Sequence, residues 1–162
     1  AQAKECTEKG LPMMRALFVE YPHDAGAWLV EDEYLFGSQM LVAPMMESGS
    51  ERDVYLPEGK WIDYQTGKTY AGGWHTIQTG TIPAVILVRD GSVLPHIKLA
   101  QNTGEMDWSQ LELKVYASDA IEATGLVCLP LDNQLHPLTV SVKGHQVKAD
   151  GLEGKVKFKV TD

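Results

Sequence analysis

A chain of 162 residues with 44% hydrophobic and 22% charged side chains is long enough and apolar enough to bury a core, which excludes a disordered chain. Its formal net charge of −8 argues against partners such as nucleic acids and anionic membrane surfaces, because both attract clusters of lysine and arginine. The sequence holds no run of about 18 apolar residues, so it predicts no membrane-spanning helix.

Residues 1–14 contain no initiator methionine, no basic leader and no apolar signal core. Their polar composition is typical of the last turns of a helix, which Gly10 ends, with Pro12 just beyond. We therefore expect the chain to begin within a longer protein.

Residues 11–46 have the pattern of a strand, a short helix and a second strand. The apolar run over residues 11–19 predicts a strand buried on both faces, as in a parallel sheet. Apolar side chains near helical spacing over residues 27–36, followed by Gly37, predict a short helix. Residues 39–46 predict another buried strand. This alternation is typical of one βα unit from a larger α/β structure.

After residue 47, short apolar runs alternate with glycines about eight to eleven residues apart, the spacing of an antiparallel sandwich or barrel. Residues 61–70 predict a hairpin, because polar turn residues separate two aromatic-rich runs. Asp90 and Gly91 predict a second hairpin, since this pair tolerates the positive φ angles of a tight turn. Residues 82–88 are apolar almost throughout and predict a central strand covered on both faces.

Residues 98–110 predict a linker. Beyond them, residues 111–117, 125–132 and 155–161 predict strands of a further small antiparallel unit, and the first and last of these alternate apolar and polar side chains with period two. The expected fold class is therefore mainly β, with antiparallel β-sandwich domains preceded by a terminal βα fragment.

Residues 51–75 hold five of the thirteen aromatic side chains, namely Tyr55, Trp61, Tyr64, Tyr70 and Trp74. They could stack against sugar rings as a binding surface. Alternatively, alternate aromatics could point into a sandwich core, where each buries roughly 150–250 Å². The turn spacing favours core packing. Trp61 remains the candidate substrate-binding residue of this stretch.

Glycoside hydrolysis requires two carboxylates beside the scissile bond. Asp24 follows a predicted strand end, where α/β barrels place functional residues, so it is the second candidate substrate-binding residue. No catalytic residue is assigned, because the sequence contains no nucleophile elbow and no phosphate-binding loop. The carboxylates available in the βα segment are Glu20, Asp24, Glu31, Asp32 and Glu33.

The five histidines are scattered without the spacing of metal ligands, so no metal site and no cofactor are expected. Cys6 and Cys128 lie far apart in the sequence. Two free, partly buried thiols are favoured over a disulfide.

The stretches GLPMMRALFVEYPHD and EDEYLFGSQMLVAPMMESGSERDVYLPEGKWIDYQTGKTYAGG resemble the late part of glycoside hydrolase family 31, which contains α-glucosidases and α-xylosidases. The resemblance is densest over residues 10–100, and the wording of the second stretch is more similar to the bacterial α-xylosidase branch. The residues that match the family pattern are Gly10, Pro12, Arg15, Leu17, Pro22, Asp24, Leu35, Gly37, Leu41 to Pro44, Tyr55 to Pro57, Gly59, Trp61, Asp63, Thr66 and Gly67.

The resemblance implies three parts. Residues 1–46 would be the terminal fragment of a (β/α)₈ catalytic barrel, residues 47–99 the proximal C-terminal β-sandwich domain, and residues 100–162 a linker with a small distal β domain. The two catalytic carboxylates of the family lie in motifs that this chain does not contain, so they would belong to the barrel upstream.

The function implied is that of the C-terminal portion of a retaining, exo-acting α-glycosidase, an α-xylosidase or α-glucosidase acting on α-linked oligosaccharides. This portion would stabilise the barrel and would be inactive alone. Its partners would be the parent catalytic barrel and an oligosaccharide. The alternative function is a stand-alone β-module that binds carbohydrate or mediates oligomerisation.

Overall fold

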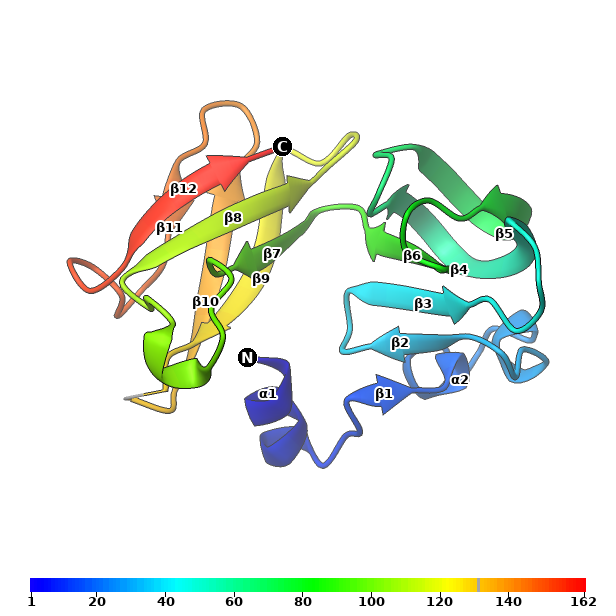
Figure 1. Cartoon of the computed structure of the whole chain (residues 1–162), viewed down its shortest axis with the longest axis horizontal. Helices are drawn as coiled ribbons and strands as arrows, with labels where there is room; N and C mark the ends of the chain where they lie inside the picture. Colours follow the sequence, from blue (N-terminus) through cyan, green and yellow to red (C-terminus); the bar gives the residue numbers. More distant parts are fainter. Residues whose placement is uncertain (131) are drawn as a thin grey trace. The chain divides into compact units, whose positions relative to one another are not determined.

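The computed structural model describes residues 1–130 and 132–162, and these described residues form two compact units (Figure 1). The N-terminal unit comprises residues 8–90, and the C-terminal unit comprises residues 1–7 and 91–162. Within the described residues, each unit contains one six-stranded sheet. The expected mainly β fold is confirmed. None of the described helices is long and apolar enough to cross a membrane.

The sheet of the N-terminal unit has the strand order β1-β2-β3-β6-β4-β5, and its strand pairs are antiparallel. The helix α1 (Gln2–Lys9) precedes it in the chain. The elements of the unit are β1 (Met14–Arg15), α2 (Leu17–Glu20), the 3-10 helix η1 (Gly26–Trp28), β2 (Tyr34–Phe36), β3 (Met40–Pro44), β4 (Glu51–Asp63), β5 (Thr69–Gln78) and β6 (Ala84–Arg89).

The elements predicted over residues 11–36 are wrong. The apolar run at residues 11–19 forms only the two-residue strand β1 and the first residues of α2. Residues 27–36 form the end of η1 and the strand β2 instead of a helix. Gly37 has a φ of +65° and lies between the paired strands β2 and β3. A glycine with positive φ serves a hairpin turn as well as a helix end, so this signal was ambiguous.

The strands on the two sides of residue 47 share one sheet. The predicted strand over residues 39–46 is present as β3, but it pairs antiparallel with both β2 and β6, which contradicts the parallel arrangement of a βα unit. The chain passes from one compact unit to the other between Asp90 and Gly91. The assignment of residues 1–46 to a catalytic barrel, with boundaries at 46/47 and 99/100, stays a prediction about the parent enzyme.

The predicted hairpin over residues 61–70 is confirmed. Trp61 stands opposite Tyr70 in the antiparallel pair of β4 and β5. The turn is built on Asp63, whose Oδ1 accepts hydrogen bonds from the main-chain N–H groups of Gln65 at 2.8 Å and Thr66 at 2.7 Å. An aspartate that binds main-chain donors two and three residues ahead stabilises a turn locally.

The strand predicted over residues 82–88 is confirmed as β6, which lies between β3 and β4 in the sheet. The hairpin predicted at Asp90 and Gly91 is wrong. Because β6 is paired along both edges, it has no free edge for a further strand, and the next strand joins the other sheet. Gly91 does adopt the predicted positive φ, +78°.

The core of the N-terminal unit is formed by alternate residues of its strands. Leu35, Leu41 and Leu87 stand opposite one another on β2, β3 and β6, and each is fully buried. Trp61 is also fully buried in this cluster, and its indole N–H donates to the carbonyl of Pro57 at 3.0 Å. Removing one such leucine side chain typically costs about 2–5 kcal/mol.

The C-terminal unit has the strand order β11-β10-β9-β7-β8-β12. The strands predicted over residues 111–117 and 155–161 are confirmed as β8 and β12, but they pair in parallel, so the sheet is mixed and not wholly antiparallel. The elements of this unit are β7 (Ser92–His96), the 3-10 helix η2 (Thr103–Glu105), β8 (Gln110–Tyr116), β9 (Glu122–Cys128), β10 (Leu135–Ser141), β11 (Val147–Lys148) and β12 (Lys157–Thr161).

The strand predicted over residues 125–132 is observed in part as β9, and position 131 of that prediction lies outside the described residues. Val93, Leu113 and Val140 are fully buried in the core of this unit. Cys6 is buried and Cys128 is partly buried, and they form no disulfide bond with each other.

The turn at Asp63 provides a direct test of the β4–β5 hairpin. Asp63→Ala removes the acceptor for two main-chain N–H groups, so we expect the free energy of unfolding to fall by about 1–2 kcal/mol. Asp63→Asn keeps an acceptor oxygen and should lose less than half of that. Urea unfolding measures both changes, with the exposed Glu51→Gln as control. An Asp63→Ala variant as stable as the wild type would contradict this role.

Candidate functional site

A cavity of about 650 Å³ lies in the N-terminal unit, and we call it the hairpin groove. One wall is the loop of residues 20–25, which includes Asp24. The other wall comes from the β4–β5 hairpin and includes Tyr55, Glu58, Gly59, Gly72 and Gly73. A volume of roughly 300–1,000 Å³ is usual for a small-molecule site.

The hairpin wall of the groove is mostly backbone. The pairing of β4 with β5 is irregular between Leu56 and Lys60, and in this interval lies Gly59, with a φ of +132°. Gly73 on β5 has a φ of +115°. A Cβ atom placed on Gly59 or Gly73 would meet no atom within 4 Å, so both glycines face open space. A ligand can therefore approach the main chain closely here.

Asp24 holds the opposite wall in place. Its Oδ1 accepts hydrogen bonds from the main-chain N–H of Gly26 at 2.9 Å and from the hydroxyl of Tyr55 at 2.7 Å. The hydrogen bond to Asp24 raises the pKa of Tyr55 to about 12, with burial as a smaller cause, so the hydroxyl stays protonated and donates. The ring of Tyr55 packs so closely on Gly26 that a Cβ atom there would overlap it. The predicted site residue Asp24 therefore lies on the groove, while its substrate-binding role stays a prediction.

The other predicted site residue, Trp61, has no exposed surface and forms part of the core. The exposed aromatic of this hairpin is Trp74, which is 62% exposed. Trp74 stands opposite Tyr55 across β4 and β5, with ring centroids 5.4 Å apart. Sequence reasoning did not select Trp74. The place of each strand in the sheet distinguishes the two tryptophans. Trp61 lies where β4 is paired on both sides, whereas Trp74 lies on β5, at an edge of the sheet.

The carboxylates considered for glycoside hydrolysis mostly have structural partners. Glu20 forms an ion pair with the buried guanidinium of Arg15. Asp32 accepts a hydrogen bond from Arg52 at 2.6 Å. Glu33 is 5% exposed and accepts from the main-chain N–H of Tyr55 at 2.8 Å, while Glu31 is exposed. Glu20, Asp32 and Glu33 therefore have structural roles.

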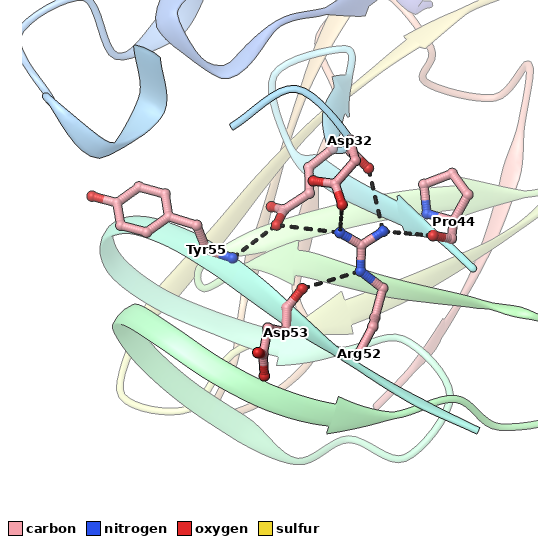
Figure 2. A network of polar contacts seen from close by, with 6 residues as sticks. Asp32, Pro44, Arg52, Asp53 and Tyr55 are labelled. Carbon is pink, nitrogen blue, oxygen red and sulfur yellow. Dashed lines mark hydrogen bonds and ion pairs between the residues drawn. The ribbon is translucent and has the colours of Figure 1, made fainter. Parts of the chain in front are cut away.

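Arg52 connects the start of β4 to two other segments. Figure 2 shows its guanidinium between the carboxylate of Asp32 and the carbonyl of Pro44, to which it donates at 2.5 Å. Its Nη2 also lies 3.8 Å from Glu33 Oε1. The side chain of Arg52 is 11% exposed, whereas that of Asp32 is 53% exposed, so water reaches the Asp32 side of this network.

Glu33 is held in this network at an energetic cost. Burial raises the pKa of its carboxyl to about 7, although the hydrogen bond from Tyr55 and the charge of Arg52 act in the opposite direction. Its Oε2 is buried without a hydrogen-bond partner among the described residues. Burial without a hydrogen-bond partner for one oxygen destabilises the charged form of the Glu33 carboxyl.

Metal binding finds no support in the described part of the chain, where no three histidine, cysteine, aspartate or glutamate side chains are grouped to hold an ion. The buried His136 instead bonds Asp132 at 2.9 Å and the carbonyl of Asp150 at 3.0 Å. This histidine has a structural role in the C-terminal unit.

Glu33 predicts a specific pH dependence of stability. The folded chain keeps the Glu33 proton up to about pH 7, whereas the unfolded chain releases it near the ordinary pKa of 4.5. Stability should therefore fall as the pH rises through this window, by up to about 3 kcal/mol, and then level off. In Glu33→Gln this fall should be absent, as measured by urea unfolding at a series of pH values.

Glu31→Gln is the matched control, because Glu31 is an exposed neighbour, and it should follow the wild type. If the difference between Glu33→Gln and the wild type did not change between pH 4.5 and pH 7, the buried carboxyl would not titrate as inferred.

The comparisons with known proteins agree with the resemblance. The family model described as the glycosyl hydrolase family 31 C-terminal domain matches residues 10–94. Alpha-glucosidase 2 of Bacillus thermoamyloliquefaciens is 35% identical over 122 residues, which are 74% of this chain and 15% of the relative. An alpha-xylosidase of Emericella nidulans is 38% identical over 104 residues, and the match covers 59% of this chain and 13% of the xylosidase.

Among solved structures, a GH31 dextranase of Flavobacterium johnsoniae in complex with glucose is 28% identical, with a TM-score of 0.77. The match covers 91% of this chain and 20% of the dextranase chain. This chain thus spans a fifth or less of each of these relatives. It belongs to glycoside hydrolase family 31, and its residues 10–94 correspond to the C-terminal domain of that family.

Proposed function

We propose that this chain is the C-terminal portion of a retaining, exo-acting α-glycosidase, an α-xylosidase or α-glucosidase that acts on α-linked oligosaccharides. The chain stabilises the catalytic barrel of that enzyme, and the barrel carries the two catalytic carboxylates. The names of two relatives, alpha-glucosidase 2 and alpha-xylosidase, support this substrate class.

The observation that carries the structural role is an exposed apolar surface on the N-terminal unit, which we call the 13–36 patch. Of the twelve large apolar side chains that are exposed on the described residues, seven lie in this segment. Exposed apolar side chains that gather in this way mark contact surfaces. The seven are Met13, Met14, Phe18, Val19, Trp28, Leu29 and Phe36.

Two pairs of residues within the patch lie side by side. Met14 and Phe36 stand opposite each other on β1 and β2. Phe18 of α2 stacks on Trp28 of η1, with ring centroids 4.4 Å apart and planes 14° from parallel. Two aromatic rings that stack and remain exposed form a broad, flat apolar surface.

A catalytic barrel is the partner that best fits this patch. The chain spans 9–15% of the length of its first curated relatives, so most of such an enzyme lies outside it. The resemblance implies that a family 31 catalytic barrel is among the parts of the enzyme outside this chain. The packing of apolar side chains against it would remove them from water, at about 25 cal/mol for each Å² of apolar surface buried.

The activity of the chain alone tests whether catalysis belongs to the barrel and not to this chain. We expect the purified 162 residues to hydrolyse neither 4-nitrophenyl α-xyloside nor 4-nitrophenyl α-glucoside above background. The reason is that the family mechanism needs two carboxylates about 5–5.5 Å apart, which we place outside this chain. Turnover that copurifies with the chain and survives a change of expression host would overturn the proposal.

Leu29→Asp tests the docking of the patch. Leu29 is 80% exposed, so the substitution should leave the stability of the chain itself within about 0.5 kcal/mol of the wild type. In the full-length enzyme the same change buries a charge against the barrel and should cost about 2 kcal/mol or more. Thermal unfolding of both forms measures the difference.

Ile121→Asp is the matched control, because Ile121 is 76% exposed and belongs to the C-terminal unit. If Leu29→Asp were as harmless as this control in the full-length enzyme, the patch would not contact the barrel.

A further inference from the structure

None of the seven side chains of the 13–36 patch lines the hairpin groove, and the shape and chemistry of the groove indicate a ligand. We propose that the groove binds a neutral sugar, one or two pyranose rings long, with Trp74 and Tyr55 as the aromatic surface. This inference goes beyond the stabilising role proposed above and does not depend on it.

The aromatic surface lies at one end of the groove. Tyr55 lines the cavity, whereas Trp74 does not line it but stands opposite Tyr55 on β5 and contacts its ring, which extends the aromatic surface beyond the cavity. An indole that is 62% exposed has a free face for a ligand. The axial C–H groups of a pyranose form a flat apolar surface that packs on such a ring, while its hydroxyl groups remain in water or reach polar partners.

The polar partners lie on both walls. Oδ1 of Asp24 already accepts from Tyr55 and Gly26, but Oδ2 has no hydrogen-bond partner among the described residues, so it can accept a sugar hydroxyl. On the hairpin wall, the β4–β5 register gives no cross-strand partner to residues 57–59. The carbonyl of Pro57 is occupied by the indole of Trp61, so the main-chain groups of Glu58 and Gly59, beside the open face of Gly59, are the ones that can bond a ligand.

The bonding of Tyr55 makes this site rigid before a ligand arrives. Its hydroxyl is held by Asp24 and its main-chain N–H by Glu33, so both ends of the residue are fixed. A preorganised aromatic side chain loses little conformational entropy when it binds.

The composition of the groove selects among ligand classes. Neither lysine nor arginine is among its described lining residues, which disfavours phosphate, sulfate and sulfonate groups. An amine is the remaining competitor, because Glu20, Asp24 and Glu58 are acidic. Glu20 is neutralised by Arg15, and the carboxylates of Asp24 and Glu58 can accept sugar hydroxyl groups as well as attract a cation, so an alkylammonium ion is the competing probe in the test below.

Tryptophan fluorescence of the 162-residue chain tests the proposal, with methyl α-D-glucoside, methyl α-D-xyloside and isomaltotriose as probes. At least one of these sugars should change the emission with a saturable, millimolar dependence. In Trp74→Ala the change should disappear or need about tenfold more sugar. Trp108→Ala is the matched control, since Trp108 belongs to the C-terminal unit, and it should bind like the wild type.

Amide shifts in two-dimensional NMR give an independent readout, and they should be confined to residues around Gly59, Gly73 and Asp24. Because Trp74 is exposed, Trp74→Ala should unfold at the same temperature as the wild type, which separates loss of binding from loss of folding.

Three results would overturn the proposal. One is the absence of any saturable change with all three sugars. Another is loss of the signal in Trp108→Ala but not in Trp74→Ala. The third is a shift of the groove amides by n-butylammonium and not by sugar. None of them bears on barrel docking, which Leu29→Asp tests separately.

Discussion

Tyr55 is held at both ends, by Glu33 through its main-chain N–H and by Asp24 through its hydroxyl. These two hydrogen bonds join residues 24–33 to β4, although this segment contributes no strand to the sheet. The segment contains only the short helix η1 as regular structure. Its position on β4 therefore depends on side-chain bonds to Tyr55 and on the contacts of Arg52 with Asp32.

The hairpin groove and the 13–36 patch both follow from this attachment. The loop that carries Asp24 forms one wall of the groove, and η1 behind it presents Trp28 to the patch. The two surfaces use different side chains of one short segment. A domain that stabilises a barrel can therefore carry a second binding surface, although the two are connected where the Trp28 indole donates to the carbonyl of Pro22 at 3.0 Å.

The charge on Glu33 is the cost of this arrangement. A carboxylate that is 5% exposed and has a buried, unpartnered oxygen is a poor choice for stability alone. The place of Glu33 beside β4 explains its role, because its carboxyl oxygen accepts a hydrogen bond from the main-chain N–H of Tyr55. Arg52 moderates the cost without removing it.

The sequence was informative where local patterns determine structure. The hairpin at residues 61–70 and the central strand β6 follow from turn residues and from an uninterrupted apolar run. The helix predicted over residues 27–36 failed because Gly37 suits a β2–β3 turn equally well. The hairpin at Asp90 failed because both edges of β6 are occupied, which only the sheet order reveals.

The candidate site was predictable in part. Asp24 was selected because it follows a predicted strand, and it does line the groove. The exposed aromatic side chain is Trp74 and not Trp61, and this difference depends on which strand lies at the edge of the sheet. Edge and centre are properties of the whole sheet. Period-two alternation gives the face of a side chain, and it does not give the place of its strand in the sheet.

The central claim is that the seven exposed apolar side chains of the 13–36 patch form the contact surface for the catalytic barrel. Amide hydrogen exchange of this segment, compared between the 162-residue chain and the full-length enzyme, tests it most directly. The account predicts that residues 13–36 exchange markedly more slowly in the full-length enzyme, while the β8–β12 pair exchanges alike in both. Equal exchange of the segment in the two proteins would contradict it.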